Sequence, residues 1–238
     1  KLRRAETRSD GALRVLRTAG DVRRLMVERL GGSDTTGALL SIEGLQNLEG
    51  KAANLDRLHA AGFRMAGLVH FFDNELGGSM HGLAKGGLTP FGREIVRAME
   101  AKGMIVDVAH SSHQTVADIV AMAQRPVVSS HGGVQATCKV NRNLTDAEIQ
   151  AIARTGGIVG IGYWDAAVCD ISPAGIAAAI THVRDLVGIR HVALGSDFDG
   201  AVTTGFDTSQ LVAITQALID RGFTDAEMNA AWVGERGI

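Results

Sequence analysis

Five residues that can bind a metal ion or transfer a proton stand at the ends of short apolar segments in this sequence. These residues are Glu43, His70, His110, His131 and Asp197, and a sixth apolar segment ends at Tyr163. A carboxylate and several imidazoles gathered in one pocket are typical of a transition-metal site, and zinc is well suited to such ligands. We therefore predict a metal site that contains Glu43, His110 and His131, in which the carboxylate could bridge two ions.

Each of these residues also has an ordinary structural interpretation. A single histidine at a strand end is more often a structural residue than a ligand, but two of them with a glutamate on separate strands favour a metal site. Asp197, if it is not a ligand, could take a proton from water and pass it to a leaving amine. Arg142 either holds a substrate carboxylate through two hydrogen bonds or is a surface residue near a helix start. His81 lies in a glycine-rich loop, where we favour a structural role over substrate contact.

Elements that could position these side chains alternate along the chain. Apolar segments at 37–44, 63–70, 104–110, 126–131, 157–163 and 191–197 are each followed by an amphipathic helical segment. This alternation predicts an α/β fold with a parallel sheet. The carboxyl ends of all strands meet at one mouth in a (β/α)8 TIM barrel, whereas a doubly wound sheet gathers ligands mainly at one switch point. Five polar strand ends therefore favour the barrel, with six of its eight strands evident.

Residues 1–37 are expected to be a helical lead-in to a single domain that covers residues 1–238. Helix starts are predicted at Thr89, before a proline, and at Thr145 and Thr224, which begin capping boxes. Two cysteines, Cys138 and Cys169, do not form a disulfide framework or a metal motif, so we expect two ordinary thiols.

Composition excludes some classes of partner. The net charge of the 238 residues is −2, which gives no reason to expect nucleic acid or an anionic membrane surface. Apolar segments stay well below the roughly 20 residues that a transmembrane helix needs. The first residue is not Met, so the compartment stays open, with the cytoplasm favoured.

Several separated motifs resemble one known family. SIEG, LVHFFDNELGGSMHG, GGLTPFGREIV, MIVDVAHSS, PVVSSHGGVQATCKVNRNLTD, GGIVGIGYW and ALGSDFDG occur in this order. Together they are similar to the membrane dipeptidase (renal dipeptidase, peptidase M19) family in its bacterial form, from about residue 38 to the C-terminus. The resemblance implies a (β/α)8 barrel metallo-dipeptidase with two zinc ions. It further implies a dipeptide substrate, often with a D-residue at its C-terminal position, and leaves a homodimer open.

The resemblance also implies roles for single residues. Glu43 matches the carboxylate that bridges the two zinc ions, and His110 and His131 match the ligands of the second zinc. His70 matches a histidine that contacts the substrate and the tetrahedral intermediate. Arg142 matches the residue that binds the substrate's C-terminal carboxylate, and Asp197 matches the acid/base near the scissile nitrogen.

Two features depart from the family pattern. The His-x-Asp pair that binds the family's first zinc does not occur in this sequence, and Glu235 stands where the family has an asparagine. Two alternatives therefore accompany the dipeptidase hypothesis. One is another TIM-barrel metal hydrolase that acts on a lactone or an amide, and the other is a truncated, catalytically impaired fragment.

Overall fold

Parallel strands in chain order form the centre of the fold. The computed structural model describes residues 1–199 and 201–233, so the prediction for Glu235 lies outside the described residues. Within them, seven strands form one sheet in the order β1 to β7, and each neighbouring pair is parallel. The strands are β1 (Leu13–Leu16), β2 (Thr36–Glu43), β3 (Phe63–Gly67), β4 (Ile105–Asp107), β5 (Val128–Ser129), β6 (Ile158–Ile161) and β7 (Val192–Leu194).

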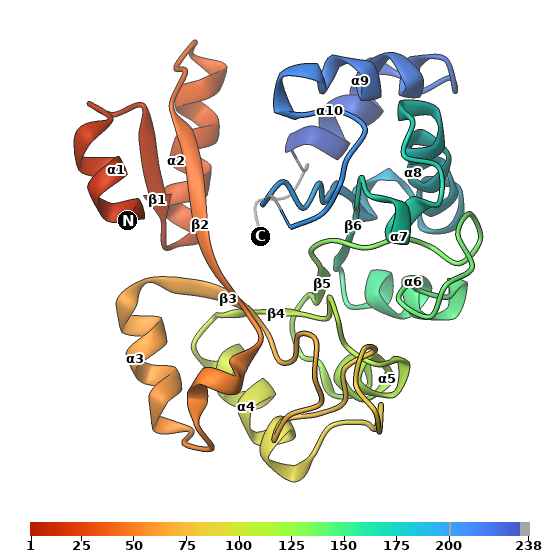
Figure 1. Ribbon diagram of the computed structural model, residues 1–238. Coiled ribbons are helices and arrows are strands. Elements are labelled where there is room, and N and C mark those ends of the chain that lie inside the picture. Colours follow the sequence, from red (N-terminus) through yellow and green to blue (C-terminus); the bar gives the residue numbers. More distant parts are fainter. Residues whose placement is uncertain (200, 234–238) are drawn as a thin grey trace.

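Helices connect the strands and lie around the outside of the sheet (Figure 1). They are α1 (Leu2–Arg8), α2 (Ala19–Leu30), α3 (Ala53–Ala61), α4 (Pro90–Ala101), α5 (His113–Met122), α6 (Asp146–Arg154), α7 (Asp165–Val168), α8 (Pro173–Val187), α9 (Val212–Ile219) and α10 (Asp225–Val233). The strand order never reverses, as it would at the switch point of a doubly wound sheet. The predicted α/β class with barrel-type strand order is therefore confirmed.

The lead-in differs from its prediction, because it contains the additional strand β1. From the sequence, residues 1–37 are expected to be helical and six strands are expected, whereas the described residues form seven strands. The segment at β1 has too few residues for its period to separate it from the helical pattern around it. Side chains of α1 and its C-terminal turn cover the outer edge of β1. Glu6 accepts the N–H of Val15 at 2.7 Å, and the Ser9 hydroxyl accepts the N–H of Leu13 at 3.0 Å.

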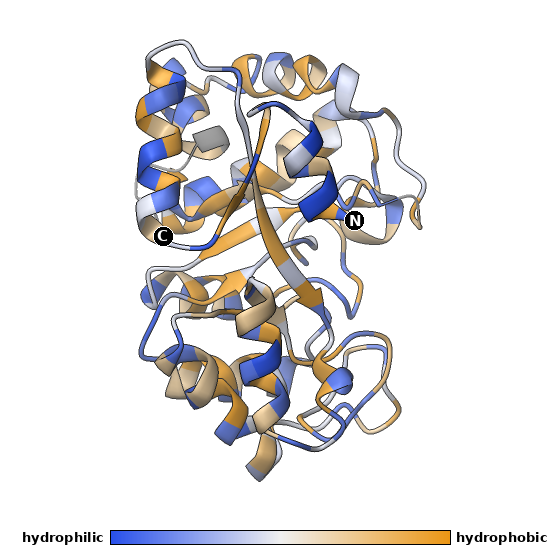
Figure 2. Ribbon diagram, turned by 90° about the vertical axis from the view of Figure 1, so that its left-hand side faces the viewer, coloured by the Kyte–Doolittle hydropathy of each residue, from blue (hydrophilic) through white to orange (hydrophobic). Residues whose placement is uncertain are grey.

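The core lies between the strands and the inner faces of the helices. Figure 2 shows predominantly hydrophobic central strands beside helices in which hydrophobic and hydrophilic residues alternate. α4, for example, buries Ile95, Val96 and Met99. Among the described residues, no helix has both the length and the apolar character needed to cross a membrane.

Helix starts follow the sequence signals. Thr89 accepts the N–H of Gly92 at the start of α4, directly before a proline. Thr145 and Thr224 each form the predicted capping box with the glutamate three residues later. These caps are confirmed, and they fix where each of the three helices begins.

Candidate active site

The three predicted metal ligands lie together at the carboxyl end of the sheet. Glu43 is the last residue of β2, His110 follows β4, and His131 follows β5. His110 Nε2 is 2.9 Å from Glu43 Oε1 and 3.0 Å from His131 Nε2. His131 Nε2 is 3.2 Å from the same carboxylate oxygen. One carboxylate and two imidazoles from three strands thus converge on one point.

His70, which follows β3, borders the same point. Its Nε2 is 3.6 Å from Glu43 Oε2, and its ring meets the His110 ring edge-on with centroids 4.5 Å apart. Donor atoms of Glu43, His70 and His110 all lie within 4.8 Å of one another. His70 is therefore close enough to act beside the predicted ligands or as an additional one.

The protonation states of these donors suit a metal ion. Burial lowers the pKa of His110 to about 4, although its hydrogen bond to Glu43 acts in the opposite direction. Hydrogen bonds from His110 and then His131 lower the pKa of Glu43. A neutral imidazole and an ionised carboxylate at neutral pH are the forms that coordinate metals.

Spacing of the donors gives a second test of the fit. Ligands about 2.1 Å from a tetrahedral zinc ion lie roughly 3.4 Å from one another. The observed separations of 2.9, 3.0 and 3.2 Å are only a few tenths of an ångström shorter. Two imidazole nitrogens 3.0 Å apart can share one proton at most, so their lone pairs cannot both be satisfied by a hydrogen bond between the rings. A metal ion between them would accept both lone pairs. The residues present therefore fit a divalent metal ion with nitrogen and oxygen ligands.

Arg142 lies on the loop after β5 and places a cation beside this cluster. Its guanidinium carbon is 4.6 Å from the centre of the Trp164 ring, a cation–π distance. Its Nη2 is buried and has no hydrogen-bond partner among the described residues. Burial lowers the pKa of Arg142 to about 10, and Asp197, Glu43 and Asp107 oppose this effect. Arg142 is thus a partly buried cation with free hydrogen-bonding capacity, in contrast to a surface residue.

Asp197 follows β7 in a left-handed backbone conformation, with φ of +61°. Burial raises the pKa of its carboxyl group, the electrostatic interaction with His131 lowers it, and the negative charges of Asp199 and Glu43 raise it further. This carboxyl group holds a proton more readily than a free aspartate, as a residue that exchanges protons with substrate requires.

Other residues from the sequence analysis lie around the cluster or away from it. The His81 ring is 5.4 Å from the His110 ring and 5.0 Å from Phe71, so its glycine-rich loop borders the site. The structural role that we favoured for His81 stays a prediction. Tyr163 is buried, and its ring packs against those of Phe198 and Phe206.

Two residues near the site were missed by the sequence reasoning. Asp107 is the last residue of β4, and its Oδ1 accepts the N–H groups of Ala109 and Ser130. Trp164 follows the sixth apolar segment, and its ring makes the cation–π contact with Arg142. The Asp107 signal was present, because an aspartate two residues before a turn residue often accepts that residue's N–H. Nothing in the sequence pairs Trp164 with Arg142.

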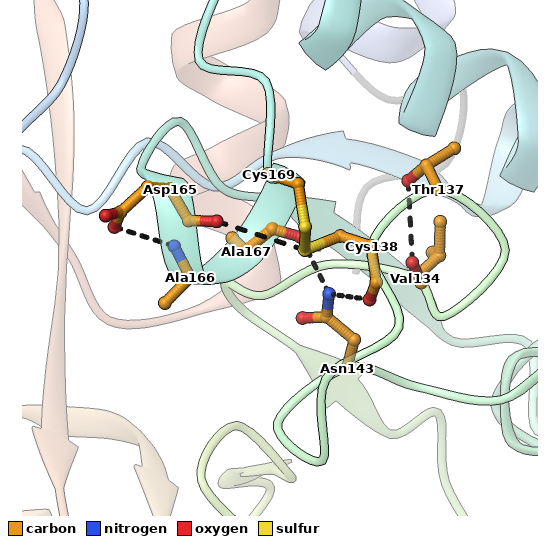
Figure 3. Close-up of a disulfide and its surroundings, with 8 residues drawn as sticks. All are labelled: Val134, Thr137, Cys138, Asn143, Asp165, Ala166, Ala167 and Cys169. Carbon is orange, nitrogen blue, oxygen red and sulfur yellow. Dashed lines mark hydrogen bonds between the residues drawn. A yellow bond between two sulfur atoms is a disulfide. The ribbon is translucent and has the colours of Figure 1, made fainter.

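The two cysteines form a disulfide, so the prediction of two ordinary thiols is wrong. Cys138 and Cys169 are 31 residues apart in the chain, and their Cα atoms are 5.4 Å apart. Figure 3 shows Asn143 beside the bridge, where its amide donates to the carbonyl oxygens of Cys138 and Ala167, each at 2.8 Å. These contacts tie the loop of Arg142 to the segment after Trp164. Sequence spacing could not reveal a pairing that depends on how two loops meet.

Comparisons of the sequence and of the structure with known proteins point to the same family. The sequence model of the family described as membrane dipeptidase (peptidase family M19) matches residues 2–235. Dipeptidase aclJ of Aspergillus oryzae is 38% identical over 195 residues, which cover 78% of this chain and 46% of that protein. An uncharacterized protein in the pqqA 5' region of Klebsiella pneumoniae is 31% identical over 205 residues, covering 81% of this chain and 74% of that protein.

The chain therefore spans less than half the length of the Aspergillus relative. Among solved structures, the probable dipeptidase PvdM from Pseudomonas aeruginosa superposes with a TM-score of 0.88 at 22% identity, covering 98% of this chain and 76% of that one. This likeness confirms the expected TIM-barrel-type fold.

Proposed function

We propose that this chain, which belongs to the membrane dipeptidase family (peptidase family M19), hydrolyses the peptide bond of dipeptides with the help of bound zinc. One observation carries the proposal. A Glu–His–His cluster with separations of 2.9 to 3.2 Å lies beside a partly buried arginine with an unpaired donor. A metal site next to a site for a carboxylate is what cleavage of a short peptide near its free C-terminus requires.

Glu43, His110 and His131 are the residues that we propose to hold zinc. A bound zinc ion polarises a substrate carbonyl and lowers the pKa of water, which makes water a nucleophile at neutral pH. Glu43 has a second carboxylate oxygen, 3.6 Å from His70, that is available to a second ion. Its 42% exposed side chain leaves the cluster open to solvent and substrate on one side.

His70 and Asp197 are the residues that we propose to act on the substrate. The imidazole of His70 lies over the cluster, where it can donate a hydrogen bond to the oxygen of the attacked carbonyl. Asp197, with its raised pKa, can receive the proton that the attacking water loses and deliver it to the leaving nitrogen.

Arg142 distinguishes a dipeptidase from the alternative hydrolases. A guanidinium can bind the C-terminal carboxylate of a dipeptide through two parallel hydrogen bonds, whereas a lactone or a neutral amide offers no such anion. The buried Nη2 of Arg142, without a protein partner, supports an anionic substrate.

The test combines zinc binding with hydrolysis by the purified chain. We expect at least one zinc ion per chain, dipeptide hydrolysis that chelation abolishes and zinc restores, and loss of zinc from Glu43→Gln and His110→Ala. Arg142→Ala should raise the KM for dipeptides at least tenfold and leave lactone or ester turnover unchanged. Zinc-independent turnover, or lactones outrunning dipeptides, would contradict the proposal. A chain that binds no zinc and has no activity would support the impaired-fragment alternative.

A further inference from the structure

Asp107 lies on β4, the strand that precedes His110, and it borders β5, the strand that precedes His131. It is the last residue of β4, its backbone is paired with Gly67 of β3 and Val128 of β5, and it is only 6% exposed. A carboxylate is rarely buried in this way unless hydrogen bonds compensate for the lost water. The groups that donate hydrogen bonds to the Asp107 carboxylate therefore indicate its role.

Both partners of Asp107 Oδ1 precede a proposed metal ligand. The oxygen accepts the N–H of Ala109 at 3.0 Å and the N–H of Ser130 at 2.9 Å. Ala109 is followed by His110, and Ser130 is followed by His131. One oxygen atom thus joins the two segments that present the imidazoles, although the segments come from different strands.

The first hydrogen bond supports a strained backbone at His110. This residue has φ of +63°, a left-handed conformation that costs free energy for a residue with a Cβ. Asp107 holds the turn on its N-terminal side, and the N–H of Ser111 closes the turn on the carbonyl of Val108 at 3.0 Å. This turn presents the His110 ring to the site, where its Nε2 is 2.9 Å from Glu43 Oε1.

The second hydrogen bond acts on His131 through Ser130. With its N–H held by Asp107, Ser130 places its hydroxyl 2.8 Å from His131 Nδ1. A hydroxyl that accepts from Nδ1–H leaves the lone pair on Nε2, which is the atom that lies 3.2 Å from Glu43. This contact orients the ring, and the hydroxyl can hold the proton on Nδ1 as metal binding through Nε2 requires.

We propose that Asp107 is a positioning residue that holds His110 and His131 ready for the metal ion through the N–H groups of Ala109 and Ser130. The inference rests on the proposed function, because it assigns these two histidines to a metal. Asp107 itself does not contact the metal donors through any described hydrogen bond, so its effect is transmitted through the backbone.

The test measures zinc affinity by competition with a coloured chelator in Asp107→Ala and Asp107→Asn. Loss of a group that orients metal ligands typically costs 10- to 100-fold in metal affinity, and we expect this loss for the alanine variant. The asparagine variant keeps one side-chain oxygen acceptor and should stay within about threefold of the unsubstituted chain. Asp107→Ser replaces the alanine variant if that variant does not fold.

Thr155→Val is the matched control. Thr155 also accepts a backbone N–H next to β5, that of Val127 at 3.0 Å, but before the strand and so at the opposite end of the sheet from the site. This variant should lose stability without losing zinc affinity. Zinc affinity of Asp107→Ala equal to that of the unsubstituted chain would overturn the proposal.

A metal-free measurement separates this inference from the proposed function. The ¹⁵N shifts of the His131 ring report which nitrogen carries the proton, and we expect the Nδ1–H form in the unsubstituted chain and a mixture of forms in Asp107→Ala. If the unsubstituted chain binds no zinc, the proposed function fails, but this change in the His131 ring would still support the positioning role. Unchanged ring shifts would overturn the positioning role.

Discussion

At the residue scale, two carboxylates of the site lie in opposite electrostatic settings. Hydrogen bonds from two imidazoles lower the pKa of Glu43, whereas burial raises that of Asp197. Pairs of acids whose pKa values are pushed apart by their surroundings commonly divide the chemistry between them. The ionised partner suits a permanent ligand, and the other suits proton transfer.

This division predicts the effect of Asp197→Asn. The amide keeps the size of the side chain but cannot accept and release a proton, so kcat for dipeptides should fall by about 10²- to 10⁴-fold. Zinc content, measured by elemental analysis, should not change, because Asp197 is not among the proposed ligands. A variant that loses zinc together with activity would show that Asp197 acts as a ligand instead.

The ring under Arg142 gives a second prediction at this scale. Trp164→Leu removes the cation–π contact at 4.6 Å, which is worth about 0.5–2 kcal/mol. The KM for dipeptides should rise about 2- to 30-fold with little change in kcat, because the arginine would orient the substrate less well. Trp164→Phe keeps an aromatic face and should recover part of the loss. A fall in kcat alone would place Trp164 in the chemical step.

At the scale of elements, the site depends on close contact between the carboxyl ends of β5 and β7, which flank β6 in the sheet. Gly195 directly follows β7 and packs against the backbone of the β5 end. A Cβ there would collide with the carbonyl oxygen of Ser130 and lie 2.9 Å from the Cα of His131. The spacing of the strands at the mouth thus requires a residue without a side chain at this position.

Gly195→Ala should therefore disturb His131, although β6 separates β7 from β5 in the sheet. Overpacking of this kind typically costs about 1–3 kcal/mol, and we expect a loss of that size in the free energy of unfolding by urea. Zinc affinity should also fall, since His131 must shift. Gly86→Ala, where an added Cβ meets no atom within 4 Å, is the control and should leave both quantities unchanged. Equal zinc affinity in the two variants would contradict this account.

Strand ends were predictable from the sequence because parallel strands present their carboxyl ends on one side. The convergence of Glu43, His110 and His131 follows from that rule and from the apolar runs before each residue. The left-handed turn at His110 did not follow, since no glycine or asparagine marks it. Nor did β1, whose four residues, Leu13–Leu16, lie between two helices. Short elements that depend on tertiary contacts leave little trace in local periodicity.

At the scale of the whole molecule, the disulfide links the loop that carries Arg142 to a distant part of the chain. It joins a loop after β5 to the residue after α7, and Arg142 lies on the first of these. Structural disulfides are typical of oxidising compartments. The cytoplasmic location favoured from the sequence stays a prediction, and the Cys138–Cys169 bridge is an observation against it.

Removal of the bridge tests how much the fold and the site depend on it. Closing a loop of about 30 residues lowers the entropy of the unfolded chain by an amount worth about 3–4 kcal/mol. Cys138→Ser with Cys169→Ser should lose about that much in the free energy of unfolding. Asn143 still ties the two loops through its amide, so zinc affinity should persist while the KM for dipeptides rises several-fold as Arg142 loosens. The phosphine reductant TCEP, which binds zinc much more weakly than a dithiol, should reproduce these changes in the unsubstituted chain and have no effect on the double variant. If the reductant leaves the unsubstituted chain's stability and KM unchanged, the bridge does not constrain the site.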